Sequence, residues 1–121
     1  MSAGSAPGVE FELIRTLFRD RGARRSDVLL GIGDDAALLA PTAAETLVAC
    51  VDTLVADVHF PGDAPPDSVG HKALAVNLSD LAAMAAEPRW VLLSVTLPAA
   101  DRDWLQAFVS GFDRLARSQH V

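Results

Sequence analysis

The chain has 121 residues, half of them hydrophobic, which is enough for one domain with a hydrophobic core. Its formal net charge of -6, without any long basic run, argues against a nucleic-acid-binding surface. No apolar run reaches membrane-spanning length, and the single cysteine rules out an internal disulfide and fits a reducing compartment. We therefore expect a cytoplasmic protein with neither a nucleic-acid nor a membrane partner.

The first half of the chain predicts one helix followed by short strands. Residues 1–8 are small and are expected to be flexible, and they lack the pattern of a signal peptide. Residues 10–20 are predicted to form an amphipathic helix. Strands are predicted over 28–30 and 36–40, and a third over 46–51, whose apolar run suggests burial on both faces. The inward face of the helix is predicted to carry Phe11, Ile14, Leu17 and Phe18.

The second half predicts two long helices separated by a strand. Residues 54–66 are rich in proline and glycine and are expected to form a loop, either a lid or a substrate-contacting segment. Asp67 is expected to cap a helix that ends near residue 86, and residues 90–97 form the best strand pattern. Asp101 opens a last helix, and this order of elements is typical of an α/β or α+β domain. The inward residues of the last helix are predicted to be Trp104, Leu105, Phe108, Phe112 and Leu115, with Arg102, Arg114 and Arg117 outward.

Three acidic segments stand out: Gly31-Ile32-Gly33-Asp34-Asp35, Val51-Asp52-Thr53 and Asn77-Leu78-Ser79-Asp80. Each carboxylate lies in or beside an apolar run, with no lysine or arginine next to it in sequence. A buried carboxylate is costly unless something cationic meets it. We favour a divalent metal that carries a nucleotide.

Asp80 is the sharpest of these positions. On a helical wheel it shares a stripe with Val69, Ala73, Val76 and Met84, which is expected to face the core. No residue three or four positions away can neutralise it, so a partner must come from outside the helix. The alternative is a buried carboxylate that caps a nearby backbone turn, or a local end to the helix.

The other two segments fit the same site. Asp52 directly follows a predicted strand, where open sheets present functional groups. Asp34 and Asp35 follow two glycines, which allow close approach to a phosphate, and Mg²⁺ prefers hard oxygen ligands. Alone, Gly-Asp-Asp is more often an ordinary turn. Three acidic positions in one small domain favour the metal site.

Other chemistries have little support. The sequence has no P-loop, kinase-type glycine loop, zinc pattern or GxSxG motif. Cys50 lies in an apolar run, which disfavours a nucleophilic thiolate. His59 beside Phe60 is either a surface residue or a substrate contact. Lys72 and the basic residues 21–25 are interpreted as solvated surface charges.

Taken together, these segments resemble the thiamine-monophosphate kinase family, within a superfamily that includes aminoimidazole ribonucleotide synthetase and selenophosphate synthetase. The match covers most of the chain, and its longest segment is highly specific. The matching segments are Glu10-Phe11, Gly31 to Ala36, Asp52-Thr53-Leu54-Val55, His59-Phe60, Lys72 to Met84 and Pro88-Arg89-Trp90.

The resemblance implies a fold and a reaction. It implies that residues 9–121 are an N-terminal ATP- and Mg²⁺-binding domain with a mixed sheet, helices packed on one face, and sheet pairing across a homodimer. It implies that Asp35, Asp52 and Asp80 are metal ligands and that His59 contacts substrate. The implied reaction transfers the γ-phosphoryl group of ATP to thiamine phosphate, yielding thiamine diphosphate.

The chain also departs from the family pattern. Cys50-Val51 replace a Ser-Thr pair, and Ala85 replaces a glycine. The family's second domain would begin beyond Val121, so we expect the chain alone to have negligible kinase activity. Two alternatives remain: a non-catalytic dimerisation and nucleotide-binding module, or a superfamily relative that acts on another substrate.

Overall fold

The computed structural model describes residues 7–121, and its regular elements are short except for two long helices. Residues 1–6, most of the segment expected to be flexible, lie outside the described residues, and residues 7 and 8 belong to the first helix. None of the helices over residues 7–121 is long and apolar enough to cross a membrane. In chain order the elements are α1 (Pro7–Leu13), the π-helical turn η1 (Ile14–Phe18), β1 (Val28–Leu30), β2 (Leu38–Leu39), α2 (Pro66–Ala83) and α3 (Arg102–Ser118).

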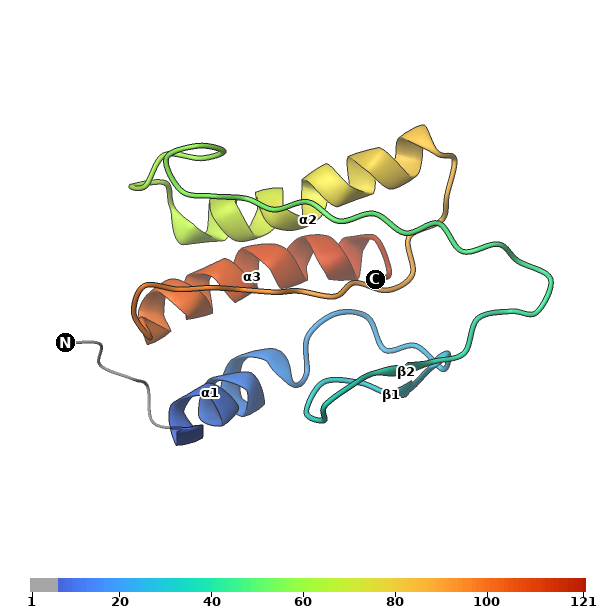
Figure 1. The fold of residues 1–121 in the computed structure, drawn as a ribbon, viewed down its shortest axis with the longest axis horizontal. Helices are drawn as coiled ribbons and strands as arrows, with labels where there is room; N and C mark the ends of the chain where they lie inside the picture. The colour runs from blue at the N-terminus through green and yellow to red at the C-terminus, as the bar shows by residue number, and fades with distance from the viewer. Residues whose placement is uncertain (1–6) are drawn as a thin grey trace.

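Helices α2 and α3 lie side by side and form the centre of the fold (Figure 1). Their backbones approach so closely at Gly70 and Gly111 that a Cβ atom on either glycine would overlap the other helix. A Cβ on Gly70 would lie 2.0 Å from the Phe108 carbonyl oxygen, and one on Gly111 would lie 1.9 Å from the Asp67 carbonyl oxygen. The two glycines therefore set the separation of the helices.

The hydrophobic core has two parts along this helix pair. The larger part joins η1 to both helices, and the smaller part lies at the C-terminal end of α3. Phe108 stacks on Trp104 and Phe112, with ring centroids 5.3 and 6.2 Å apart. The buried residues are Leu17, Val69, Leu105, Phe108 and Val109 in the first part and Leu74, Ala116 and Val121 in the second.

The inward residues expected on the first helix are only partly confirmed. Leu17 is buried, but Phe11 is 70% exposed. The turn η1 explains the difference, because a π turn holds more residues than an α turn and rotates the apolar stripe that 3.6-residue periodicity predicts. Phe11 therefore leaves the face on which Leu17 lies.

The two long helices begin differently. The cap of α3 is confirmed, because the Asp101 side chain accepts a hydrogen bond from the Trp104 amide at 2.9 Å. The predicted cap of α2 is wrong. Pro65 occupies that position without a side-chain bond, Pro66 starts the helix, and Asp67 lies in its first turn. Proline fits there because the first helical amides have no partner inside the helix.

The sheet of the described chain has two strands. β1 and β2 pair antiparallel, with Val28 opposite Leu39, so the strands predicted at 28–30 and 36–40 are confirmed, the second in shortened form. The strands predicted at 46–51 and 90–97 are wrong, since these residues run as long segments without ladder hydrogen bonds (Figure 1). A strand needs a neighbour for pairing, which an apolar pattern does not supply.

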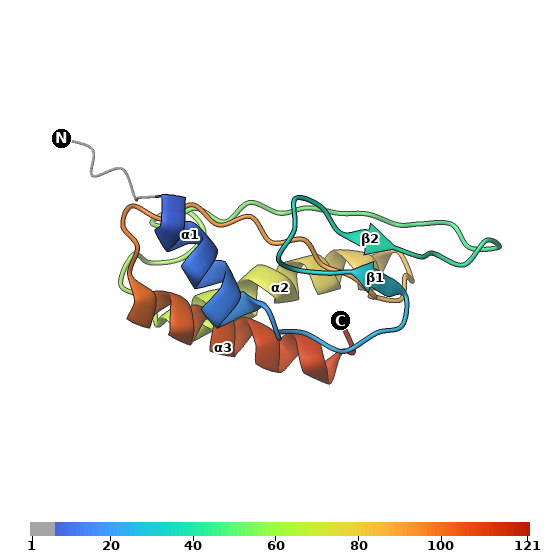
Figure 2. The same cartoon turned by 90° about the horizontal axis from the view of Figure 1, so that it is seen from below.

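These unpaired segments and the β1–β2 hairpin lie on one side of the α2–α3 pair (Figure 2). The expected burial of residues 46–51 is also wrong, because Val51 is 87% exposed. On the second segment, Leu92 is 85% exposed. The described chain is therefore an α+β fold with the α2–α3 pair on one side and an open layer of extended segments on the other.

The basic residues 21–25 are not simply solvated. Asp113 is a buried carboxylate of α3 that accepts hydrogen bonds from the Gly22 amide at 2.6 Å and from Arg117 Nε at 2.9 Å, with Arg21 3.6 Å away. Arg25 makes two hydrogen bonds to Asp27 and a third to the His120 carbonyl. The basic loop is thus fastened to the end of α3, which corrects the solvated interpretation.

Candidate functional site

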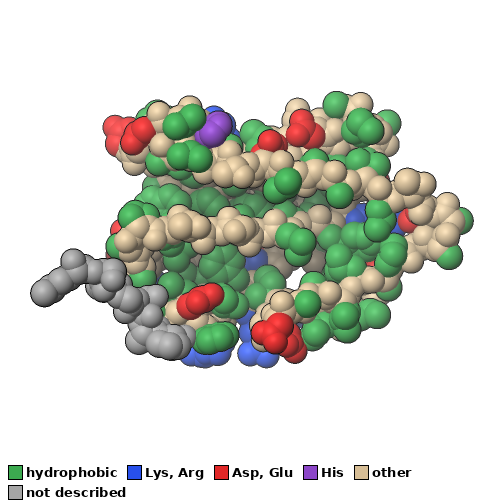
Figure 3. Space-filling view, viewed as in Figure 1, with side chains coloured by type: hydrophobic (Ala, Val, Ile, Leu, Met, Phe, Trp, Pro, Cys, Tyr) green, Lys and Arg blue, Asp and Glu red, His purple; other side chains and the backbone are tan. Residues whose placement is uncertain are grey.

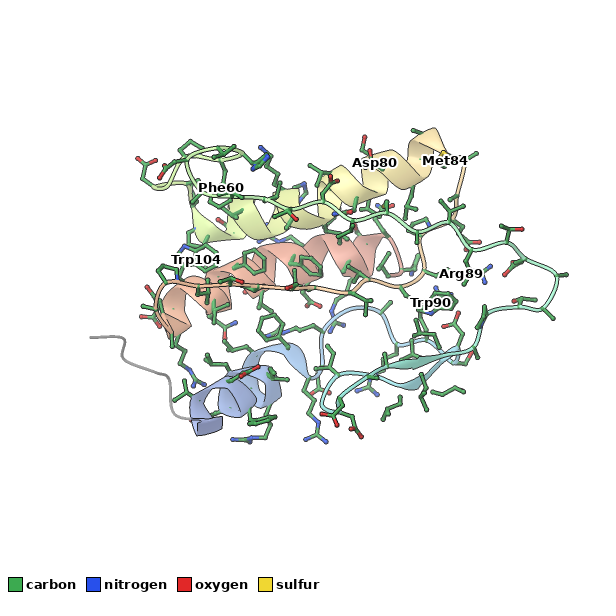
Figure 4. All side chains as sticks on the ribbon, viewed as in Figure 1. Phe60, Asp80, Met84, Arg89, Trp90 and Trp104 are labelled. Carbon is green, nitrogen blue, oxygen red and sulfur yellow. The ribbon has the colours of Figure 1, made fainter. Side chains whose placement is uncertain are left out.

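Asp80 lies on α2 but does not face the core, so this expectation is wrong. Both Asp80 and Met84 are exposed, and Asp80 points away from α3 (Figure 4). The buried residues of α2 are Val69, Gly70 and Leu74, all in its first half. Burial therefore does not force a cation onto Asp80, and its case as a ligand must depend on its neighbours.

The neighbourhood of Asp80 contains a second predicted ligand and a thiol. The thiol of Cys50 donates to the backbone and side-chain oxygens of Asn77, at 3.6 Å each, so residues 50–52 pass close to α2. Partial desolvation, and then the negative charges of Asp80 and Asp52, raise the pKa of the Cys50 thiol. Two of the three predicted ligands thus act on one thiol, from two segments far apart in sequence.

Asp35 is not brought to this place. It lies in the turn between β1 and β2, and α3 separates this turn from α2 in Figure 1. In that turn the Asp34 carboxylate accepts a hydrogen bond from the Asp35 amide at 2.8 Å, and Gly33 has a φ of +120°, a conformation that favours glycine. The local geometry is that of a self-bonded turn.

Acidic side chains occur in several separate places on the face seen in Figure 3. Over residues 7–121, no three histidine, cysteine or acidic side chains lie close enough together to hold a metal ion. Carboxylate and amide oxygens fit Mg²⁺ in chemistry, and Mg²⁺ commonly takes only one or two carboxylates and completes its shell with waters and phosphate oxygens. Asp52, Asp80 and Asn77 offer oxygen donors of the type that Mg²⁺ takes, and the metal-ligand roles of Asp35, Asp52 and Asp80 stay predictions.

The loop that contains His59 is tightly organised. Asp57, with a φ of +62°, donates its amide to the Phe60 carbonyl at 2.8 Å, and its carboxylate accepts from the Gly62 amide at 2.8 Å. Phe60 packs against the larger core (Figure 4). These contacts fix the loop on the molecule, which favours the substrate-contacting role over a mobile lid.

His59 itself is exposed, and both its ring and its backbone amide are hydrogen-bonded to Val55. The Val55 amide donates to His59 Nδ1 at 2.9 Å, and the His59 amide donates to the Val55 carbonyl at 2.9 Å. The ring borders a shallow hollow of about 360 Å³ lined by Asp57, Val58, Phe60 and Pro61. The nitrogen Nε2 is the remaining polar atom of the ring that can bind a ligand.

Sequence reasoning missed the partner of this loop. Lys72 of α2, interpreted as a surface charge, donates from Nζ to the backbone carbonyl of His59. The available signal was that Lys72 is the only lysine in the chain and lies thirteen residues after His59, at the start of a helix that follows the loop.

A second hollow, of about 330 Å³, lies at the C-terminal end of α2. Arg89 at its edge makes two hydrogen bonds to Glu45, at 2.7 and 2.8 Å, and this contact lowers the pKa of Glu45 (Figure 4 shows Arg89 beside Trp90). Its lining mixes apolar side chains with Glu45, Glu87 and the paired Arg89. We assign this hollow to the packing of residues 45–48 against α2.

Residues 33–121 match the family described as AIR synthase related protein, N-terminal domain. The chain belongs to this family. Among curated proteins, this AIR synthase related domain is 52% identical over 99 residues to the thiamine-monophosphate kinase of Escherichia coli (strain K12), covering 82% of the chain and 30% of that protein.

Two further relatives carry the same name. The thiamine-monophosphate kinases of Buchnera aphidicola subsp. Acyrthosiphon pisum and Bacillus subtilis (strain 168) are 41% and 40% identical over 112 and 114 residues. Each alignment covers 93% of the domain and 35% of the relative. The chain thus spans about a third of the length of these relatives, and the family resemblance inferred from the motifs is confirmed.

Proposed function

We propose that this chain is the N-terminal, metal-nucleotide-binding part of a thiamine-phosphate kinase, which transfers the γ-phosphoryl group of ATP to thiamine phosphate. The observation that carries the proposal is the 52% identity to a thiamine-monophosphate kinase over 82% of the chain. The proximity of Asp52 and Asp80 to one thiol supports it, because two separate segments supply carboxylates to one place.

Different residues of the chain serve the two anionic reactants, ATP and thiamine phosphate. Magnesium, when bound, offsets the negative charge that makes phosphoryl transfer between two phosphates difficult. Asp52 and Asp80 supply hard oxygen donors for it, and the Asn77 side chain contacts the thiol of Cys50 nearby. His59 lies on a fixed loop and offers a ring nitrogen to the thiamine phosphate. We assign no side chain as a general base.

The test uses the full-length parent protein and follows ATP-dependent formation of thiamine diphosphate. Asp52→Asn and Asp80→Asn should each lower kcat/KM by at least about a hundredfold, since a metal ion contributes several kcal/mol to transition-state charge stabilisation. Asp103→Asn, at an exposed position in the first turn of α3, is the matched control and should leave the rate within about twofold. Full activity in Asp80→Asn would contradict the proposed ligand role.

The isolated chain provides a second test. It should bind Mg²⁺-ATP weakly in calorimetry and should make no measurable thiamine diphosphate, because the resemblance implies that a further domain completes the pocket. Robust turnover by residues 1–121 would contradict this division of roles. Nucleotide binding by the chain together with an inactive full-length parent would favour the non-catalytic module.

We also propose that two copies pair through the open layer. The exposed apolar residues of the extended segments support this pairing, because a surface of this kind is typical of a protein interface. They include Leu29, Leu38, Leu47, Val51, Val55 and Leu92.

A further inference from the structure

One cation of the chain is bonded to the backbone of the His59 loop. Lys72 reaches from the second turn of α2 and donates from Nζ to the His59 carbonyl. Both residues are exposed, so the bond is not a by-product of core packing. A lysine with its four-carbon stem can span from a helix to a loop without burying its charge.

The ring of His59 is held by Val55, at the start of the same turn. Because a backbone amide only donates, His59 Nδ1 accepts from the Val55 amide, and the neutral ring then carries its proton on Nε2. The ring, which borders the hollow formed by residues 57–61, therefore carries an N–H donor at Nε2 rather than an acceptor. A proton on Nδ1 would set two N–H groups against each other and open the turn.

We propose that Lys72 is a positioning residue that holds the His59 backbone so that the Val55 amide can bond to Nδ1 and Nε2–H faces the phosphate oxygen of the substrate. The inference rests on the proposed function only for the identity of that substrate. The contacts of Lys72, His59 and Val55 belong to the chain itself. Lys72 acts through the loop and does not touch substrate.

The loop explains why an outside support is needed. Its internal bonds join Asp57 to Phe60 and Gly62, and Phe60 is its anchor in the core. The backbone carbonyl of His59 is not part of these bonds and accepts from Lys72 instead. The His59 amide and the Phe60 carbonyl are also bonded, so the loss of this contact leaves the loop in place. It removes the bond that holds the His59 carbonyl, which lets the peptide after His59 tilt and weakens the alignment of the ring with the Val55 amide.

The first experiment measures the bond directly in the 121-residue chain. At pH 9, above the range in which free histidine titrates, NMR should detect a scalar coupling across the hydrogen bond between the Val55 nitrogen and His59 Nδ1. Lys72→Met should abolish this coupling and speed hydrogen exchange of the Val55 amide by roughly fivefold to tenfold, the loss of one net hydrogen bond. Lys72→Arg should restore both signals.

The controls separate this effect from general unfolding. Arg15→Met removes another exposed cation, from η1, and should leave the coupling intact. The Trp104 amide, which is bonded to Asp101, should keep its exchange protection in every variant. An unchanged Val55 coupling in both Lys72→Met and Lys72→Gln would overturn the proposal.

The second experiment uses the full-length parent. Lys72→Met should raise the KM for thiamine phosphate roughly tenfold and change kcat less than twofold, with recovery in Lys72→Arg. Loss of the coupling without a change in KM would overturn the substrate-facing part of the inference. If the wild-type parent makes no thiamine diphosphate, the proposed function fails, whereas the coupling still decides whether Lys72 positions His59.

Discussion

Gly70 of α2 and Gly111 of α3 mark the two points at which the central helices touch through their backbones. Each glycine faces the carbonyl oxygen of the other helix, at distances that leave no space for a Cβ atom. The arrangement is reciprocal, since Gly70 meets Phe108 and Gly111 meets Asp67. This contact sets where the first turns of α2, and with them Lys72, lie relative to the core.

Alanine at either glycine should destabilise the fold. A Cβ at 1.9–2.0 Å from a backbone oxygen forces the helices apart, so Gly70→Ala and Gly111→Ala should each lower the free energy of unfolding by about 1–3 kcal/mol or more. Urea denaturation followed by circular dichroism measures this change. Gly8→Ala on α1, where a Cβ meets nothing within 4 Å, is the control and should lie within about 0.5 kcal/mol of wild type. Equal stability of all three variants would contradict the close approach.

Asp113 should contribute to stability through its charge. Burial acts to raise the pKa of Asp113, but the Gly22 amide and the Arg117 and Arg21 guanidinium groups outweigh it and hold that pKa below its usual value. Asp113→Asn keeps the shape but leaves the donors around it without a charged acceptor. We expect a loss of about 1–3 kcal/mol in the free energy of unfolding. Asp63→Asn, at an exposed position, serves as the control, and equal effects of the two substitutions would refute the role of Asp113.

Acid should destabilise the chain in a defined pH range. Arg25 donates two hydrogen bonds to Asp27 and lowers its pKa to about 2, and the pKa of Asp113 is lowered as well. A carboxyl group whose pKa is lower in the folded state stabilises the fold above its unfolded pKa, about 3.9, and this stabilisation is lost as the pH falls through the folded value. The urea concentration at the unfolding midpoint should therefore decrease as the pH is lowered from about 4 to about 2. Asp27→Asn should make this fall shallower, and an identical pH profile would contradict the ion pair.

The sequence predicted the helical half of the fold better than the sheet. The apolar stripe and the Asp101 cap of α3 are local signals, and both are confirmed at Leu105, Phe108 and the Trp104 amide. The strands at 46–51 and 90–97 were predicted from apolar runs, which indicate extended backbone but not a pairing partner. Sheet pairing depends on contacts distant in sequence, which one chain's pattern does not fix.

At the candidate site, too, local signals were predicted better than contacts between residues distant in sequence. Periodicity placed Asp80 on the stripe of Val69, yet the second half of α2 has exposed residues where the first half is buried, so the stripe does not stay in the core along the whole helix. The motifs identified Asp52, Asp80 and His59 as candidates. They could not identify Lys72 or Asp113, because a lysine bonded to a loop carbonyl and a carboxylate bonded to a distant amide depend on tertiary contacts.

The reactivity of Cys50 should report the charges of the proposed ligands. The carboxylates of Asp80 and Asp52 help to raise the pKa of the thiol, so replacing either by asparagine should lower that pKa and increase the thiolate fraction at pH 8. Asp80→Asn and Asp52→Asn should therefore react faster with iodoacetamide than wild type. Asp35→Asn, in the turn that α3 separates from α2 in Figure 1, should leave the rate unchanged. A faster rate in Asp35→Asn but not in Asp80→Asn would contradict the observed placement of the three aspartates.

The open layer should make the chain self-associate. Val51 and Leu92 are more than four-fifths exposed on segments whose backbone groups have no ladder partner, so pairing with a second copy would cover both apolar surface and free backbone groups. We expect sedimentation velocity at micromolar concentration to show a dimer. Val51→Glu and Leu92→Glu should shift it to monomer without changing the circular dichroism spectrum of the folded chain, because neither side chain is buried within one chain. Gln106→Glu, exposed on α3, adds the same charge on the helical side and should leave the dimer intact. A monomeric profile for the wild-type chain, or equal dissociation by Gln106→Glu, would contradict an interface on the open layer.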